Sequence, residues 1–200
     1  MTPEMGIYAA WTAWFISWIA AAGWASAPAK TAGWSREFTY RAVQIAGFLA
    51  LFTFRGGPPG RGSGVSFFLY QPLWMLQPEV GWLMVALAVV GFAFCWWARL
   101  HLGRLWSGTV TRKEGHHVVD TGPYGIVRHP IYTGLLLAIF AMAAIRATPL
   151  ALLGSLMIAV AFVLKARLEE TFLGEELGRE TYDAYRRRVP MLVPFAPTAR

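Results

Sequence analysis

Two groups of polar residues stand beside long apolar runs and offer side chains suited to chemistry at a membrane surface. The segment from Gly122 to Gly134 carries an Arg-His-Pro triplet, at positions 128–130, where a basic loop turns into an apolar run. Two adjacent carboxylates, Glu169 and Glu170, follow the next apolar run. If both groups reach the same membrane face, a charged ligand and a lipid-soluble substrate could meet there.

Pro130 is typical of the first turn of a helix, where its missing N–H costs nothing. A helix starting at Ile131 would turn its unpaired N–H groups and positive dipole end toward Arg128 and His129, a setting that suits a carboxylate or a phosphate. A capped helix with Arg128 on lipid headgroups explains the same residues equally well. Both interpretations stay open on the residues alone.

Glu169 and Glu170 need a physical explanation. A helix that ended near Leu164 would place both carboxylates beside its negative end, at a cost of about a few tenths of a kcal/mol each. Either the helix continues to Gly178, or a cation neutralises the acids, with Lys165, Arg167 and a bound ligand as candidates. The apolar stripe that supports a longer helix comprises Leu164, Leu168, Phe172 and Leu177.

The four histidines follow the third apolar run within one polar loop: His101, His116, His117 and His129. A helical pair of metal ligands needs a spacing of three or four, and no cysteine is near, so a metal site is not favoured. We expect hydrogen bonding to a ligand or general-base chemistry instead.

The elements that must position these residues are apolar helices. The chain has 200 residues, 56% hydrophobic and 14% charged, with a mean hydropathy of +0.43, which indicates an integral membrane protein. We expect an all-α, polytopic fold of about five transmembrane helices. Residues 146–149 form a tight hairpin turn and 65–76 an interfacial or re-entrant piece. The expected spans are 7–27, 38–54, 80–98, 131–145 and 149–164.

Charge predicts the orientation. With five spans, fifteen of the 18 Lys and Arg residues fall on the side that holds the C-terminal tail. The positive-inside rule then places the N-terminus outside and the tail in the cytoplasm, in the inner membrane of a cell. The cations border membrane segments, which favours contact with membrane lipid and argues against nucleic-acid binding. We expect residues 1–98 to form an N-terminal transmembrane part and 99–200 a catalytic half.

Four motifs in sequence order resemble isoprenylcysteine carboxyl methyltransferases and the wider phospholipid methyltransferase superfamily. They are Gly115–Tyr124, Arg128–Gly134, Glu169-Glu170 and a closing Tyr182-x-x-Tyr185 with Arg188-Val189-Pro190. The resemblance covers roughly residues 99–195. The Lys165-Ala166-Arg167-Leu168 sequence before the acidic pair departs from the aliphatic-rich spacing common in the family, and either cation could take the basic role.

This resemblance implies S-adenosylmethionine as cofactor, entering a cytoplasmic pocket formed by the C-terminal half, and a lipophilic or prenylated acceptor arriving from the bilayer. It implies catalytic roles for Arg128 and Glu170. The cofactor-binding residues that it implies are His116, Val118, Val119, Gly122, Tyr124, His129, Pro130 and Glu169. Tyr124 or Tyr132 could stack on the cofactor, and Arg128 or Arg104 could hold an acceptor carboxylate.

Other functions share parts of the pattern. A phospholipid N-methyltransferase would need a base for its amine, and His129 or a glutamate could serve. Sterol-type reductases that use NADPH share the His-Pro-x-Tyr-x-Gly start, and a non-enzymatic membrane protein is a third alternative. The residues do not decide between carboxylate, amine and thiol acceptors, nor do they indicate an oligomeric state. We expect acceptor choice to lie in the first spans and in residues 65–76.

Overall fold

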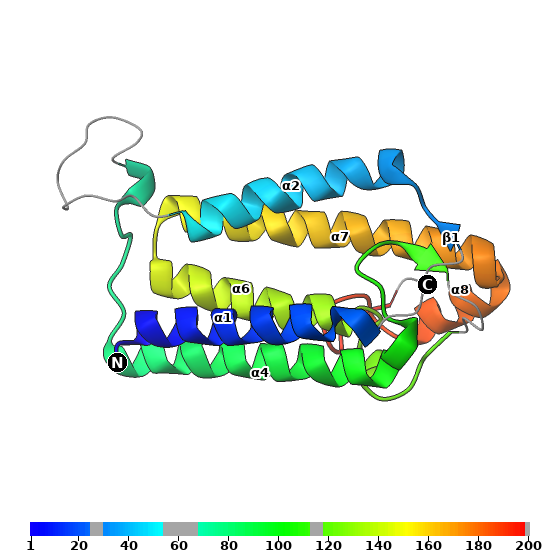
Figure 1. The fold of residues 1–200 in the computed structure, drawn as a ribbon, viewed down its shortest axis with the longest axis horizontal. Coiled ribbons are helices and arrows are strands. Elements are labelled where there is room, and N and C mark those ends of the chain that lie inside the picture. The colour runs from blue at the N-terminus through cyan, green and yellow to red at the C-terminus, as the bar shows by residue number, and fades with distance from the viewer. Residues whose placement is uncertain (25–29, 54–67, 113–117, 199–200) are drawn as a thin grey trace.

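Five long helices run lengthwise through the bundle in the computed structural model, which describes residues 1–24, 30–53, 68–112 and 118–198 (Figure 1). The first, third and fifth of them point one way, and the second and fourth run back. The N-terminus lies at one end of the bundle and the C-terminal tail at the other. The long helices are α1 (Pro3–Ala20), α2 (Trp34–Phe52), α4 (Pro78–Leu102), α6 (Pro130–Arg146) and α7 (Pro149–Leu177).

Short elements gather at the end that holds the C-terminus. They are η1 (Ala21–Trp24), β1 (Lys30–Thr31), η2 (Gly103–Leu105), β2 (Thr111–Arg112), α5 (Pro123–Ile126) and α8 (Arg179–Arg188). The fold is mostly helical, as expected, but β1 and β2 add a two-stranded antiparallel ribbon in which Thr31 lies opposite Thr111. Each strand has only two residues, and all four are polar, so the sequence shows no strand pattern there.

The tight turn between α6 and α7 is confirmed. Ala147 adopts a left-handed conformation, with φ of 54°, and ends α6. The Thr148 hydroxyl then accepts a hydrogen bond of 3.2 Å from the Ala151 N–H, and Pro149 occupies the first turn of α7. A capping threonine followed by proline is the usual start of a helix, so the chain reverses within two residues.

Helix α7 continues well past residue 164, as the apolar stripe allowed, and ends at Gly178, whose φ is 98°. This extension keeps Glu169 and Glu170 within the helix rather than at its negative end. It also carries them beyond the apolar part of the bundle toward the short elements.

Three helical stretches are long and apolar enough to cross a membrane, among the residues that the structure describes: Pro3–Gly23, Pro78–Leu105 and Pro149–Leu177. Helix α6 is apolar but has 17 residues, and α2 carries Arg36, Glu37 and Arg41 near its start. Three candidate spans indicate an integral membrane protein, while the count of five stays a prediction.

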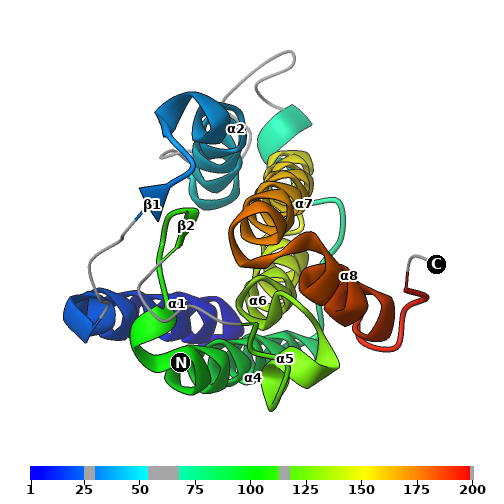
Figure 2. The same ribbon diagram turned by 90° about the vertical axis from the view of Figure 1, so that its right-hand side faces the viewer.

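Glycines let the helices approach closely. Helix α4 packs along α6, and α2 packs along α7, as the end view also shows (Figure 2). A Cβ atom at Gly91 or Gly134 would collide with the backbone of the other glycine, and Gly47 and Gly154 form a matching pair between α2 and α7. Such small-residue contacts are the usual way in which helices associate in lipid.

The described part of the interfacial piece, residues 68–76, lies at the end of the bundle remote from the C-terminus. There the Leu73 N–H donates to the Ala147 carbonyl at 2.6 Å, and the Trp74 indole donates to the Ala144 carbonyl at 3.0 Å. This piece therefore packs against the α6–α7 turn.

Candidate active site

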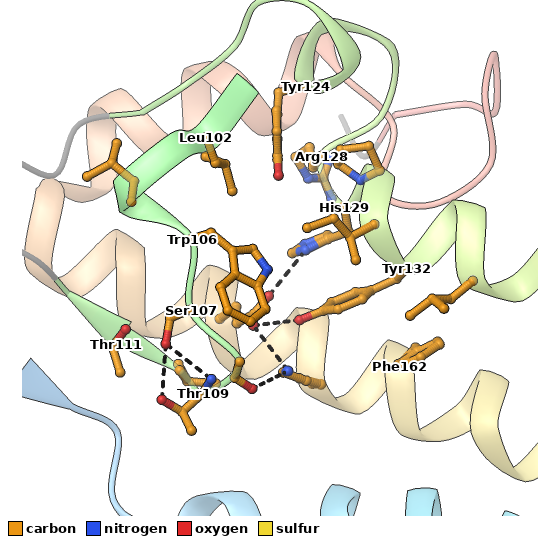
Figure 3. Close-up of a pocket in the computed structure, with 18 of the residues that line it drawn as sticks. Leu102, Trp106, Ser107, Thr109, Thr111, Tyr124, Arg128, His129, Tyr132 and Phe162 are labelled. Carbon is orange, nitrogen blue, oxygen red and sulfur yellow. Dashed lines mark hydrogen bonds and ion pairs between the residues drawn. The ribbon is translucent and has the colours of Figure 1, made fainter. Parts of the chain in front are cut away.

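A cavity of about 760 Å³ opens at the end of the bundle where the short elements gather (Figure 3). Its polar end includes Arg128, His129, Lys165 and Glu169. Its other arm is apolar and is walled mainly by rings from α1 and α2: Trp11, Trp14, Phe15, Trp18, Phe48 and Phe52. One continuous space thus joins charged groups to an aromatic compartment.

Glu169 is the carboxylate in the cavity wall. Its Oε1 accepts a hydrogen bond of 2.6 Å from the Tyr132 hydroxyl, and its Oε2 lies 3.4 Å from Nδ1 of His129. Lys165, one helical turn earlier, brings its Nζ within 4.0 Å. The side chain retains 18% of its exposure, so this carboxylate is held by neighbours and still reaches the cavity.

Glu170 lies outside the cavity wall, in a buried ion cluster. It accepts a hydrogen bond of 2.7 Å from Nε of Arg128, and Nε2 of His129 lies at 3.1 Å. The Arg186 guanidinium of α8 approaches to 3.2 Å. Removing one member of such a buried cluster leaves an uncompensated charge, which typically costs about 3–5 kcal/mol.

His129 bridges the two glutamates. Burial alone would lower the pKa of its imidazole, but the hydrogen bonds to Glu169 and Glu170 and the charges of these carboxylates outweigh burial and raise that pKa above its ordinary value of 6.5. The positive form of His129 is therefore favoured in the folded protein.

The C-terminal tail folds back over the start of α6. The N–H groups of Arg128 and His129 donate to the carbonyls of Pro190 and Met191, at 2.8 and 3.1 Å, and the Thr133 hydroxyl donates to the Leu192 carbonyl at 2.6 Å. The Arg128 guanidinium also donates to the carbonyls of residues 186 and 189. Tail carbonyls thus occupy donors that could otherwise have bound an anion.

Three aromatic rings form one wall of the cavity. His129 stacks on Tyr132 with centroids 5.4 Å apart, and Tyr132 stacks on Phe162 of α7 at 4.9 Å. Figure 3 shows the three rings as successive layers with Tyr132 in the middle. Both faces of Tyr132 are covered, so ligand stacking is better suited to Tyr124, which also faces the cavity.

The structure gathers most of the candidate residues around this space. Those that line the cavity are Val118, Val119, Tyr124, Arg128, His129, Pro130 and Glu169. Gly122 has a φ of 57° and lies against the ring of His101, whose Nε2 is 2.9 Å from the Thr121 hydroxyl. Neither Gly122 nor His101 lines the cavity. His116 lies outside the described residues.

The sequence left some residues of the cavity wall undecided or unassigned. Lys165 is buried in the cavity wall, whereas Arg167 points outward, so the structure distinguishes the two candidate cations. The rings of α1 recur at Trp11, Trp14 and Trp18, a spacing that indicates one helix face. This aromatic stripe could have indicated a cavity wall, but a stripe that faces lipid has the same pattern in the sequence. None of the described residues 68–76 lines the cavity.

The arrangement defines a class of protein. A helical bundle with candidate membrane spans, and with a carboxylate and an aromatic arm in one cavity, suits an integral membrane protein whose site can hold a cationic group beside an apolar one. Glu169 supplies negative charge at the polar end, and the arm supplies apolar surface.

Comparison with known proteins makes this class specific. Residues 84–175 match the isoprenylcysteine carboxyl methyltransferase family. A 75-residue stretch, 36% of the chain, is 48% identical to methanethiol S-methyltransferase 2 of Bradyrhizobium diazoefficiens and covers 26% of it. A stretch of 87 residues, 43% of the chain, is 32% identical to protein-S-isoprenylcysteine O-methyltransferase B of Arabidopsis thaliana and covers 44% of it.

A third relative is the nickel-cobalt-cadmium resistance protein NccN of Alcaligenes xylosoxydans, 30% identical over 115 residues, which are 56% of this chain and 52% of that protein. The chain thus spans about half, or less, of the length of these curated relatives. The match over residues 84–175 and the two methyltransferase relatives support the isoprenylcysteine carboxyl methyltransferase family and a methyltransferase.

Proposed function

We propose that this chain is a membrane methyltransferase that uses S-adenosylmethionine to methylate a lipophilic acceptor, with an isoprenylcysteine-type carboxylate as the favoured acceptor. The observation that carries the proposal is the position of Glu169, a partly buried carboxylate in the wall of a cavity that continues into an aromatic arm. The family match supplies the reaction class.

The donors in the cavity fit S-adenosylmethionine, which carries a sulfonium, an ammonium and a carboxylate. Glu169 suits the cationic groups, since it is the cavity-lining carboxylate among the described residues. Tyr124 offers a ring for the sulfonium or the adenine. The cofactor would supply an electrophilic methyl group.

The protein's own contribution is alignment and exclusion of water. The Glu169, Tyr132 and His129 contacts fix the polar wall before any ligand arrives, so little reorganisation is needed on binding. The aromatic arm holds an apolar chain and keeps the reacting end dry, which favours a displacement reaction between oriented groups.

A thiol is the second candidate acceptor. The relative with 48% identity is named for S-methylation of methanethiol, and a thiolate, like a carboxylate, is an anionic nucleophile that needs no base once ionised. The same cavity accommodates either acceptor, so the acceptor class must be determined by binding.

The proposed location is the inner membrane of a cell, with the cavity at the cytoplasmic face and the N-terminus outside. The positive-inside rule supports this orientation, because most of the chain's Lys and Arg residues belong to segments at the cavity end. A cytoplasmic opening would give direct access to a water-soluble cofactor.

Calorimetric titration of the purified protein in detergent tests the proposal. We expect micromolar binding of S-adenosylhomocysteine and no binding of NADPH. Binding of NADPH alone would indicate a sterol-type reductase, and binding of neither ligand would indicate a membrane protein without this cofactor chemistry.

A further inference from the structure

The face of α7 that lines the cavity carries three different side chains in succession. Phe162 lies in the ring stack, Lys165 follows three residues later and Glu169 four residues after that. Residues at these spacings share one helix face. Lys165 therefore stands at the junction between the apolar side of the cavity and the carboxylate at its polar end.

The surroundings of Lys165 leave its ammonium incompletely paired. The side chain is buried, its Nζ donates one hydrogen bond of 2.9 Å to the Gly108 carbonyl, and Glu169 is 4.0 Å away. The Nζ also lies 5.3 Å from the ring centroid of Tyr132 and 5.7 Å from that of Tyr40. A buried ammonium has three donors, and charges this deep are normally paired closely with an acid.

The other candidate cations are committed elsewhere. Arg128 donates to Glu170 and to two tail carbonyls, and Arg186 faces Glu170 and Asp183. Arg104 is exposed and does not line the cavity. Within the described part of the chain, Lys165 is the cavity cation with donors left for a ligand.

We infer that Lys165 recognises the anionic head of the methyl acceptor, a carboxylate or a thiolate, and excludes amine acceptors. The inference rests on the proposed function and identifies its acceptor class and specificity-determining residue. An acceptor whose apolar chain lies along the aromatic arm brings its head to the level of Lys165, one helical turn from Glu169. An ammonium head at that level would face a like charge.

The chemistry balances without a base. The anionic oxygen or sulfur of the acceptor bonds to the methyl carbon, the bond from that carbon to the sulfonium sulfur breaks, and its electron pair stays on that sulfur. The acceptor becomes a neutral ester or thioether. A carboxylate reacts without proton transfer, whereas a thiol first releases its S–H proton to water and reacts as the thiolate. Lys165 loses its partner charge at this point, which favours release of the product.

The test measures acceptor binding by calorimetry on the full-length protein saturated with S-adenosylhomocysteine. The matched probes are N-acetyl-S-farnesylcysteine and its methyl ester, which differ in the charge of the head, and dodecanethiol and dodecylamine. The variants are Lys165→Met, Lys165→Arg and the matched control Arg167→Met, which removes an outward-facing cation two residues away.

We expect Lys165→Met to lower the affinity for N-acetyl-S-farnesylcysteine about tenfold to a hundredfold, the range for a hydrogen bond to a charged group. Affinity for the methyl ester and for S-adenosylhomocysteine should stay within about twofold of the parent, since these ligands lack the proposed contact. Lys165→Arg should restore the affinity for the carboxylate probe, and Arg167→Met should leave that affinity unchanged. The parent should bind the thiol in preference to the amine.

If Lys165→Met weakened the binding of the ester and of the carboxylate equally, the inference would be overturned, because Lys165 would then act only by holding the Gly108 loop. If Lys165→Met no longer bound S-adenosylhomocysteine, the residue would belong to the cofactor site instead. Preferred binding of the amine by the parent would refute the acceptor class. Failure of the parent to bind S-adenosylhomocysteine would refute the proposed function itself, and this inference with it.

Discussion

At the scale of single residues, the site depends on Glu169. Its carboxylate lies where the cationic part of the cofactor is proposed to bind, so Glu169→Gln should lower affinity for S-adenosylmethionine about tenfold to a hundredfold. Affinity for S-adenosylhomocysteine, which lacks the sulfonium charge, should fall less. Calorimetry with both ligands measures the difference, and Glu175→Gln, an exposed acid on the same helix, is the control. Unchanged affinity in Glu169→Gln would remove this residue from the cofactor site.

His129 makes the stability of the protein depend on pH. Its pKa is raised in the folded state, so its interactions with Glu169 and Glu170 contribute fully below about pH 6.5, the ordinary value. This contribution is lost as the pH rises through the higher, native value. The midpoint of thermal unfolding in detergent should therefore differ most between the parent and His129→Gln in acid and converge in alkali. A gap that does not vary with pH would show that the bridging imidazole is not charged.

At the scale of elements, the close helix pairs limit what the sequence can tolerate. Gly134→Leu would force α4 and α6 apart, because a Cβ there already meets the Gly91 backbone. Overpacking of this kind typically costs about 1–3 kcal/mol. Gly174→Ala is the control, since nothing lies within 4 Å of its added Cβ and alanine favours the helix. Unfolding measurements in detergent should show a loss of stability for Gly134→Leu and none for Gly174→Ala. Equal stability of the two variants would argue against this packing.

The same scale shows which features the sequence could predict. The α6–α7 turn and the extension of α7 to Leu177 follow from local signals, a Thr-Pro start, an apolar stripe and a terminal glycine. The hydrogen bonds between the tail carbonyls and Arg128 do not, because carbonyl acceptors have no sequence signature. The aromatic stripe of α1 was visible, but only packing decides whether it faces lipid or a cavity. Gly122, which the family resemblance assigns to the cofactor, lies against the ring of His101, and its predicted role stays a prediction.

At the scale of the whole molecule, the site end and the α6–α7 turn end lie at opposite ends of the bundle, so the proposed orientation can be tested by labelling. Cys95, the chain's single cysteine, is fully buried between helices and gives a low background. Met75 is 93% exposed beside the α6–α7 turn, and Phe195 is 98% exposed in the tail. Each position can therefore carry a new cysteine with little effect on packing.

We expect a membrane-impermeant maleimide to label Met75→Cys in intact cells and Phe195→Cys only after the membrane is opened. The parent, tested in parallel, reports any reaction of Cys95. The reverse pattern would place the cavity outside the cell, where a cytosolic cofactor could not reach Glu169. Labelling of both variants in intact cells would mean that the long axis of the bundle does not cross the membrane, and the aromatic arm would then need an acceptor from another source than the bilayer.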